Sequence, residues 1–144
     1  MRPLSQDLSR FIEAQGPVYP RVVEELAAGR KQSHWMWFIF PQAKGLGSSA
    51  MAQRYAIGSR AEAKAYLADP VLGPRLLECT RLVLNVADKT IHDILGSPDD
   101  IKFRSSMTLF EAVSNETIFG EAIAKYYGGQ RDRATLDILA QSSP

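Results

Sequence analysis

The sequence is poor in cysteine and histidine, and it contains no hydrophobic run long enough to cross a membrane. Its one cysteine, Cys79, excludes an internal disulfide, and proteins without disulfides are typical of the reducing cytoplasm. The charged residues among positions 1–15 interrupt the apolar core that a secretory signal needs. We therefore expect a cytoplasmic protein without a membrane-spanning segment.

Neither sign of charge is in excess. The chain has 17 lysines and arginines against 16 aspartates and glutamates, which gives a formal net charge of +1. Because no basic cluster is present to neutralise a run of phosphates, we expect no duplex nucleic acid partner. The 144 residues, 45% of them hydrophobic, are enough for one domain, 1–144, with a substantial core.

Metal ligands are also scarce. No carboxylate lies three or four residues from His34, and Asp93 beside His92 would face away from it on a helix. Cys79 falls on an apolar stripe. A metal site needs three or four converging ligands, so we expect neither a metal nor a bound cofactor.

Glycine patterns that bind nucleotides are missing too. The loop 45–49 reads Gly-Leu-Gly-Ser-Ser and matches neither a Walker motif nor a complete Rossmann fingerprint. A helix is expected to begin near Ala50, so exposed amides and the Ser48 hydroxyl could hold an anion there. A plain connecting loop is the favoured interpretation.

What the sequence does contain is helical periodicity along nearly its whole length. The longest expected helix, about 71–86, carries a broad apolar stripe and is predicted to be central and mostly buried. The only plausible strand is 35–40, and one strand cannot form a sheet. We predict an all-α fold, a compact single-domain bundle of about seven to nine short helices with a frayed tail at 141–144.

Several helix boundaries are marked by residue types typical of helix ends. Ser59 and Glu62 match a capping box, in which the serine binds the N3 amide and the glutamate binds the cap amide. Thr90 begins a short helix that Gly96 ends, and Asp132 can cap the last helix.

The most unusual stretch is the segment 31–42, Lys-Gln-Ser-His-Trp-Met-Trp-Phe-Ile-Phe-Pro-Gln, which contains both tryptophans. It is too aromatic to be left in water. Trp35 and Trp37 either stack on a flat ligand or fill the core. His34 either acts as an acid–base group or bonds a backbone carbonyl, and the Gln42 amide can recognise donors and acceptors of a ligand.

A second polar cluster lies in the segment 102–110, where Ser105, Ser106 and Thr108 closely follow Lys102. Serine and threonine are poor residues for a helix interior, so the favoured interpretation is a helix boundary near Ser105 or Ser106. The alternative is a hydroxyl-and-lysine cluster that binds a polar ligand, or a serine nucleophile assisted by a desolvated Lys102.

Seven motifs along the chain carry a family resemblance. They are 33–42, 45–48, 55–57, 62–63, 66–67, 72–76 and 100–110. Together they resemble the signature of the bacterial family called domain of unknown function 1810, over about residues 8–140. The resemblance implies a small, mostly helical, single-domain protein without an established activity. Some members are labelled calpastatin, but such inhibitors are disordered and polar, whereas this chain is aromatic and expected to be compact.

The polar residues within or beside these motifs form the candidate site that the resemblance implies. They are Lys31, Ser33, His34, Gln42, Ser48, Arg75, Lys102, Ser105, Ser106 and Thr108. We predict a small-molecule pocket where 33–42 meets 102–110, with Trp35 and Trp37 as walls. A flat anionic metabolite, such as a nucleotide or an ADP-ribose derivative, would suit aromatic walls beside basic side chains.

Two alternatives stay open. The first is a hydrolase or glycosidase that acts on such a ligand through His34, Glu62 or Lys102, with Glu62 available only if its carboxylate turns inward instead of capping its helix. The second is a protein-interaction module in which the aromatic segment forms a surface patch. The sequence leaves open whether the protein is an enzyme and which oligomeric state it adopts.

Overall fold

A computed structural model describes residues 8–141 of the chain. These residues form ten α-helices, and none of them belongs to a strand. The helices are α1 (Ser9–Gln15), α2 (Tyr19–Ala27), α3 (Met36–Ile39), α4 (Ala50–Arg54), α5 (Arg60–Ala68), α6 (Leu72–Leu84), α7 (Ile91–Leu95), α8 (Asp99–Ala112), α9 (Ile118–Tyr127) and α10 (Arg133–Gln141). The all-α prediction is confirmed, and the described range contains slightly more helices than the seven to nine predicted.

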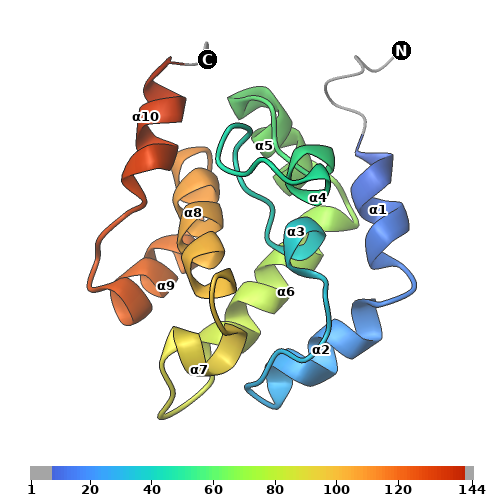
Figure 1. The fold of residues 1–144 in the computed structure, drawn as a ribbon, viewed down its shortest axis with the longest axis vertical. Coiled ribbons are helices and arrows are strands. Elements are labelled where there is room, and N and C mark those ends of the chain that lie inside the picture. The colour runs from blue at the N-terminus through green and yellow to red at the C-terminus, as the bar shows by residue number, and fades with distance from the viewer. Residues whose placement is uncertain (1–7, 142–144) are drawn as a thin grey trace.

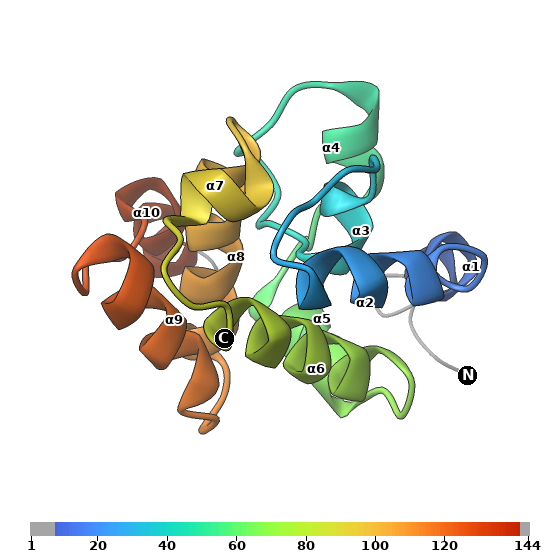
Figure 2. The ribbon, with the colours of Figure 1, turned by 90° about the horizontal axis from the view of Figure 1, so that it is seen from below.

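Two helices, α6 and α8, make most of the contacts between elements. α6 contacts α2, α5 and α9, and α8 contacts α5, α7, α9 and α10. In Figure 1, α9 and α10 lie on one side of α8 and α1 to α5 lie on the other, and Figure 2 shows the same division from below. The central helix predicted at about 71–86 is confirmed as α6, slightly shorter at both ends.

The buried hydrophobic side chains form one core cluster, in which aromatic rings join distant segments. Phe40 meets Phe103 edge to face, with ring centroids 4.9 Å apart. Phe110 lies 5.3 Å from Tyr66 and 5.9 Å from Phe119. Such pairs contribute about 0.5–1.5 kcal/mol each beyond their buried area. The aromatic segment therefore packs directly on α8.

Three of the predicted helix boundaries are confirmed. Thr90 and Asp93 complete a capping box at the start of α7, and Gly96 ends that helix. At the start of α10, Asp132 Oδ2 accepts a hydrogen bond from the Thr135 N–H at 3.0 Å. These local signals are reliable because each cap satisfies an amide that would otherwise lack a partner.

One bond of the capping box predicted for α5 is wrong. The Ser59 hydroxyl accepts from the Glu62 N–H at 3.0 Å, as predicted. The Glu62 carboxylate, however, accepts the amide of Gly58 at 2.7 Å instead of the amide of Ser59. The carboxylate therefore reaches one residue further back, where Arg10 also approaches it at 3.5 Å.

Helix α8 continues through the hydroxyl cluster, so the boundary predicted near Ser105 or Ser106 is wrong. The Ser105 and Thr108 hydroxyls donate to the carbonyls of Ile101 and Arg104, four residues earlier, at 3.3 and 2.8 Å. A hydroxyl bonded in this way is satisfied inside a helix, which removes the reason for expecting a boundary.

The segment 35–40, considered the only plausible strand, contains the one-turn helix α3 instead. The carbonyls of Trp35 and Met36 accept the N–H groups of Ile39 and Phe40 at 3.2 and 3.1 Å. Since no strand occurs among residues 8–141 to pair with it, a helical turn lets this buried backbone satisfy its own groups.

The helix expected to begin near Ala50 is α4, which begins at that residue and ends at Arg54. Beyond it, the Ile57 N–H donates to the Gln42 carbonyl and the Ile57 carbonyl accepts from the Lys44 N–H, both at 2.8 Å. This short parallel bridge ties the loop after the aromatic segment to the start of α5.

Two further predictions concerned membrane-spanning helices and a frayed tail at 141–144. No helix among the described residues is long and apolar enough to span a membrane. Gln141, the first residue of the predicted tail, is the last residue of α10, and 142–144 lie outside the described residues.

Candidate functional site

The buried carboxylate of Glu25 holds the aromatic segment against α2. Its Oε1 accepts the backbone N–H groups of Gln32 and Ser33 at 2.7 and 3.0 Å and the indole N–H of Trp35 at 2.9 Å. Its Oε2 accepts the Ser33 hydroxyl. We call these four residues the Glu25 cluster. Its hydrogen bonds fix the chain just before α3.

The same hydrogen bonds change the acidity of Glu25. Burial on its own would raise the pKa of this carboxyl, but the Ser33 hydroxyl, the two amides and the Trp35 indole stabilise the charged form and lower the pKa to about 2. Trp35 itself is only 1% exposed. Its ring therefore belongs to the core, and its N–H is used within the protein.

Two lysines lie over the tryptophan rings. The Lys102 ammonium is 5.0 Å from the ring centroid of the half-buried Trp37, and that of Lys31 is 5.2 Å from the ring of Trp35. Asp99 pairs with both lysines, at 2.9 Å from Lys31 and 3.7 Å from Lys102. Where the aromatic segment meets α8, the charged side chains are thus already paired with each other and packed on the tryptophan rings.

The three predicted hydroxyls of α8 face the interior. Ser105, Ser106 and Thr108 are each at most 2% exposed. Ser105 and Thr108 donate within the helix, and the Thr108 oxygen also accepts the Asp132 N–H at 3.0 Å. The Ser106 hydroxyl is buried without a hydrogen-bond partner among the described residues. In this conformation a ligand from solvent reaches none of them.

The remaining predicted residues lie nearer the surface. His34 and Ser48 are exposed, and Gln42 is half-buried. Within residues 8–141, the side chains of His34 and Gln42 make no hydrogen bond, so neither acts as a structural link there. The predicted site is therefore divided between the core, the surface and the lysine–tryptophan contacts.

Arg75 belongs to a separate polar cluster around Cys79. Its guanidinium lies 4.6 Å from the ring centroid of Tyr19 and 3.4 Å from the Gln15 side-chain oxygen, and the Tyr19 hydroxyl donates to Glu78. Burial raises the pKa of the Cys79 thiol to about 12, which keeps it neutral and weakly nucleophilic. Across 8–141 no group of three potential metal-binding side chains occurs.

A cleft that the sequence reasoning missed lies between α1, α4 and the start of α5. Its volume is about 370 Å³. The lining residues are Arg10, Lys44, Gln53, Arg54, Ala56, Gly58, Ser59 and Glu62. We call it the cationic cleft. The basic residues in this lining, Arg10, Lys44 and Arg54, come from separate parts of the sequence. The cleft therefore cannot be recognised from a cluster of basic residues along the chain.

Arg10 joins the walls of the cationic cleft. Its Nε donates to the carbonyl of Arg54 at 2.8 Å, and its Nη2 donates to the carbonyl of Ala56 at 2.9 Å. The same Nη2 lies 3.5 Å from Glu62 Oε1. One guanidinium from α1 therefore fixes both the end of α4 and the turn that leads into α5.

The cationic cleft carries an excess of positive charge. Lys44 and Arg54 are exposed and have no acidic partner in the described part of the chain, and the Arg54 guanidinium lies 5.5 Å from the Tyr55 ring centroid. Among the described lining residues, Glu62 is the only carboxylate, and its Oε1 is occupied by the Gly58 N–H and by Arg10. The N-terminal end of α5 adds a partial positive charge. This arrangement favours an anion.

Comparison with known proteins finds a family that matches nearly the whole chain. The family described as protein of unknown function (DUF1810) matches residues 5–139. The chain belongs to this family. The resemblance carried by the sequence motifs is thus confirmed over nearly its full extent.

The fold has also been seen in a crystal structure. The conserved hypothetical protein Rv1873 from Mycobacterium tuberculosis is 56% identical, with a TM-score of 0.94 over 95% of this chain and 99% of that chain. No curated protein matches the sequence. The family is described as one of unknown function and Rv1873 as a hypothetical protein, so any functional inference depends on the geometry.

Proposed function

We propose that this protein binds a small anionic metabolite in the cationic cleft. The observation that supports this most directly is that Lys44 and Arg54 line one cleft without an acidic partner among the described residues. Hydrogen bonds from such cations to a carboxylate or phosphate are about twice as strong as those between neutral groups. The volume of about 370 Å³ is within the range of small-molecule sites.

The basis of recognition differs from the one that the sequence suggested. The described lining of the cationic cleft includes no aromatic side chain, while Trp35 is buried and Trp37 lies under Lys102. We therefore propose recognition by charge, through the phosphate groups of a nucleotide or ADP-ribose derivative, in place of stacking on tryptophan.

A hydrolase acting on such a ligand is the second candidate, and Glu62 favours it. This carboxylate lines the cleft and is only 5% exposed. Both of its hydrogen bonds from other groups go to Oε1, and none goes to Oε2 from the described residues. Oε2 is therefore placed to accept a proton from a bound hydroxyl or water. Product formation from ADP-ribose that Glu62→Gln abolishes would support this candidate.

The binding proposal is tested by calorimetric titration at low salt with pyrophosphate, ADP and ADP-ribose. We expect Lys44→Gln and Arg54→Gln each to weaken binding about tenfold, which is about 1.4 kcal/mol. Lys64→Gln and Arg21→Gln are matched controls, because both residues are exposed and neither lines the cleft. If no anion of the panel binds, or if all four variants bind equally well, the proposal is wrong.

A further inference from the structure

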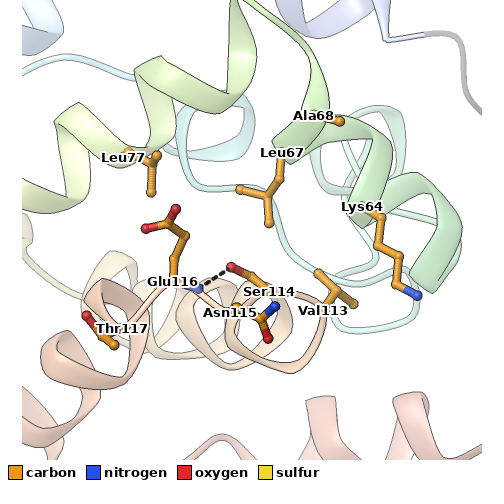
Figure 3. Close-up of a pocket in the computed structure, with 9 residues that line it drawn as sticks. All are labelled: Lys64, Leu67, Ala68, Leu77, Val113, Ser114, Asn115, Glu116 and Thr117. Atoms are coloured by element: carbon orange, nitrogen blue, oxygen red, sulfur yellow. Dashed lines mark hydrogen bonds between the residues drawn. The ribbon is translucent and has the colours of Figure 1, made fainter.

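A second cavity, of about 510 Å³, lies between α5, α6 and the loop that joins α8 to α9. Figure 3 shows Leu67 and Leu77 on one side of it and the loop residues Val113 to Thr117 on the other. Leu67, Leu77 and Val113 are half-buried and pack against the core, so they form a fixed apolar wall. We call this cavity the α5–α6 groove. None of its described lining residues also lines the cationic cleft.

Opposite charges lie at the two ends of the α5–α6 groove. Figure 3 shows the Glu116 carboxylate beside Leu77, and Lys64 at the far end beyond Val113. Neither side chain forms an ion pair or hydrogen bond within the described part of the chain. The Ser114 hydroxyl accepts the Glu116 N–H at 2.8 Å and so fixes the backbone from which this carboxylate extends. The charges are therefore available to an occupant.

The groove continues along α6. A neighbouring hollow of about 400 Å³ shares Glu116 and Thr117 with it and is also lined by Arg81 and Leu84 of α6 and by Asn85, which follows that helix. At about 1.5 Å per helical residue, the positions from Leu77 to Leu84 extend the groove by roughly 10 Å. Glu116 thus lies midway along an elongated surface, which suits an extended chain better than a compact metabolite.

We propose that the α5–α6 groove binds a short extended peptide with an acidic, a bulky apolar and a basic residue at alternate positions. Alternate side chains of an extended chain point to the same side, about 6.6 Å apart. The acidic side chain pairs with Lys64, the apolar one packs between Leu67 and Leu77, and the basic one pairs with Glu116. The order of charges in the groove thus fixes the direction of the peptide.

Fluorescence anisotropy tests this with a labelled heptapeptide that has glutamate, leucine and lysine at its second, fourth and sixth positions and serine elsewhere. We expect saturable binding below about 1 mM. We expect a peptide with serine in place of both the glutamate and the lysine to bind at least about fivefold more weakly, because it can pair with neither Lys64 nor Glu116.

Protein variants sharpen the test. We expect Glu116→Lys to weaken binding about tenfold, and a peptide with glutamate in place of its lysine to regain most of that loss. Glu24→Lys is the matched control, because Glu24 is exposed on α2 and is not among the described residues that line the groove or the neighbouring hollow. Ala68 is exposed at the rim, so Ala68→Phe is expected to obstruct the groove without disturbing the core.

Three results would overturn the peptide proposal. One is the absence of saturable binding to the wild-type protein, and another is equal affinity in the wild-type, Glu116→Lys and Ala68→Phe proteins. The third is a dimer in sedimentation that Ala68→Phe dissociates, since the groove would then be covered by a second copy of the chain. Melting curves of both variants, compared with that of the wild type, verify that each has folded.

Discussion

The Glu25 cluster and the cationic cleft both bring charged groups to places where the chain changes direction, but they use these groups differently. Glu25 is 8% exposed, and its carboxylate accepts four hydrogen bonds from one short segment. Lys44 and Arg54, in contrast, are exposed and have no acidic partner within residues 8–141. The comparison teaches that chemical richness in a sequence does not show which polar groups are available to a ligand, because Ser33 and Trp35 of the aromatic segment already bond to Glu25.

The largest expected difference between the two regions is in stability. Trp35→Ala removes a fully buried indole and leaves one hydrogen bond of Glu25 unmade, so we expect the free energy of unfolding to fall by about 3–5 kcal/mol. Arg54→Gln, in the cationic cleft, is expected to change it by less than about 0.5 kcal/mol. Urea unfolding measures both. A loss below about 1 kcal/mol for Trp35→Ala would mean that the Glu25 cluster is not structural.

The next difference between the two regions is the dependence of stability on pH that Glu25 confers. The folded pKa of Glu25 is about 2, below its ordinary value of 4.5, so its contribution to stability is present above pH 4.5 and is lost as the pH falls toward 2. We expect this loss to be roughly 3 kcal/mol. Unfolding curves between pH 7 and pH 2 measure it. In Glu25→Gln the slope across this window is expected to be smaller, and an unchanged slope would assign the acid sensitivity to other carboxyl groups.

The smallest effect concerns the lysine that covers Trp37. Lys102→Gln removes an ion pair with Asp99 and a contact with the ring, so we expect a stability loss of about 0.5 kcal/mol, with anion binding unchanged. Urea unfolding and the calorimetric titration check the two parts, with Lys64→Gln as the control. A tenfold loss of anion affinity in Lys102→Gln would indicate that the anion binds beside the aromatic segment and not in the cationic cleft.

Much of the helical fold was predictable from local signals. Asp132 and Thr90 cap their helices because a side-chain oxygen near a free amide depends only on neighbouring residues. The apolar stripe of α6 predicted a central helix because burial follows the helical period. Ser105 and Thr108 misled the boundary prediction, since hydroxyls can also bond the carbonyl four residues earlier.

The candidate site was less predictable, for a physical reason. The cationic cleft depends on Arg10, Lys44 and Arg54, which are close in space only because Arg10 bonds carbonyls more than forty residues away and Ile57 bridges Ala43. The spacing of apolar residues along a sequence contains no information on such long-range contacts. By contrast, the contact between the aromatic segment and α8 was anticipated, but the roles of Lys102 and Asp99 within it required the structure.

The Glu25 cluster also has a consequence for how the chain folds. Its hydrogen bonds connect residues at most ten positions apart, from α2 to the residue just before α3. Loops of about ten residues close within roughly 10–100 ns, far faster than contacts between distant segments can form. The hairpin-like unit of α2 and the aromatic segment can therefore assemble ahead of the longer-range packing. It can present Phe40 to α8 as a preformed surface on which the rest of the core condenses.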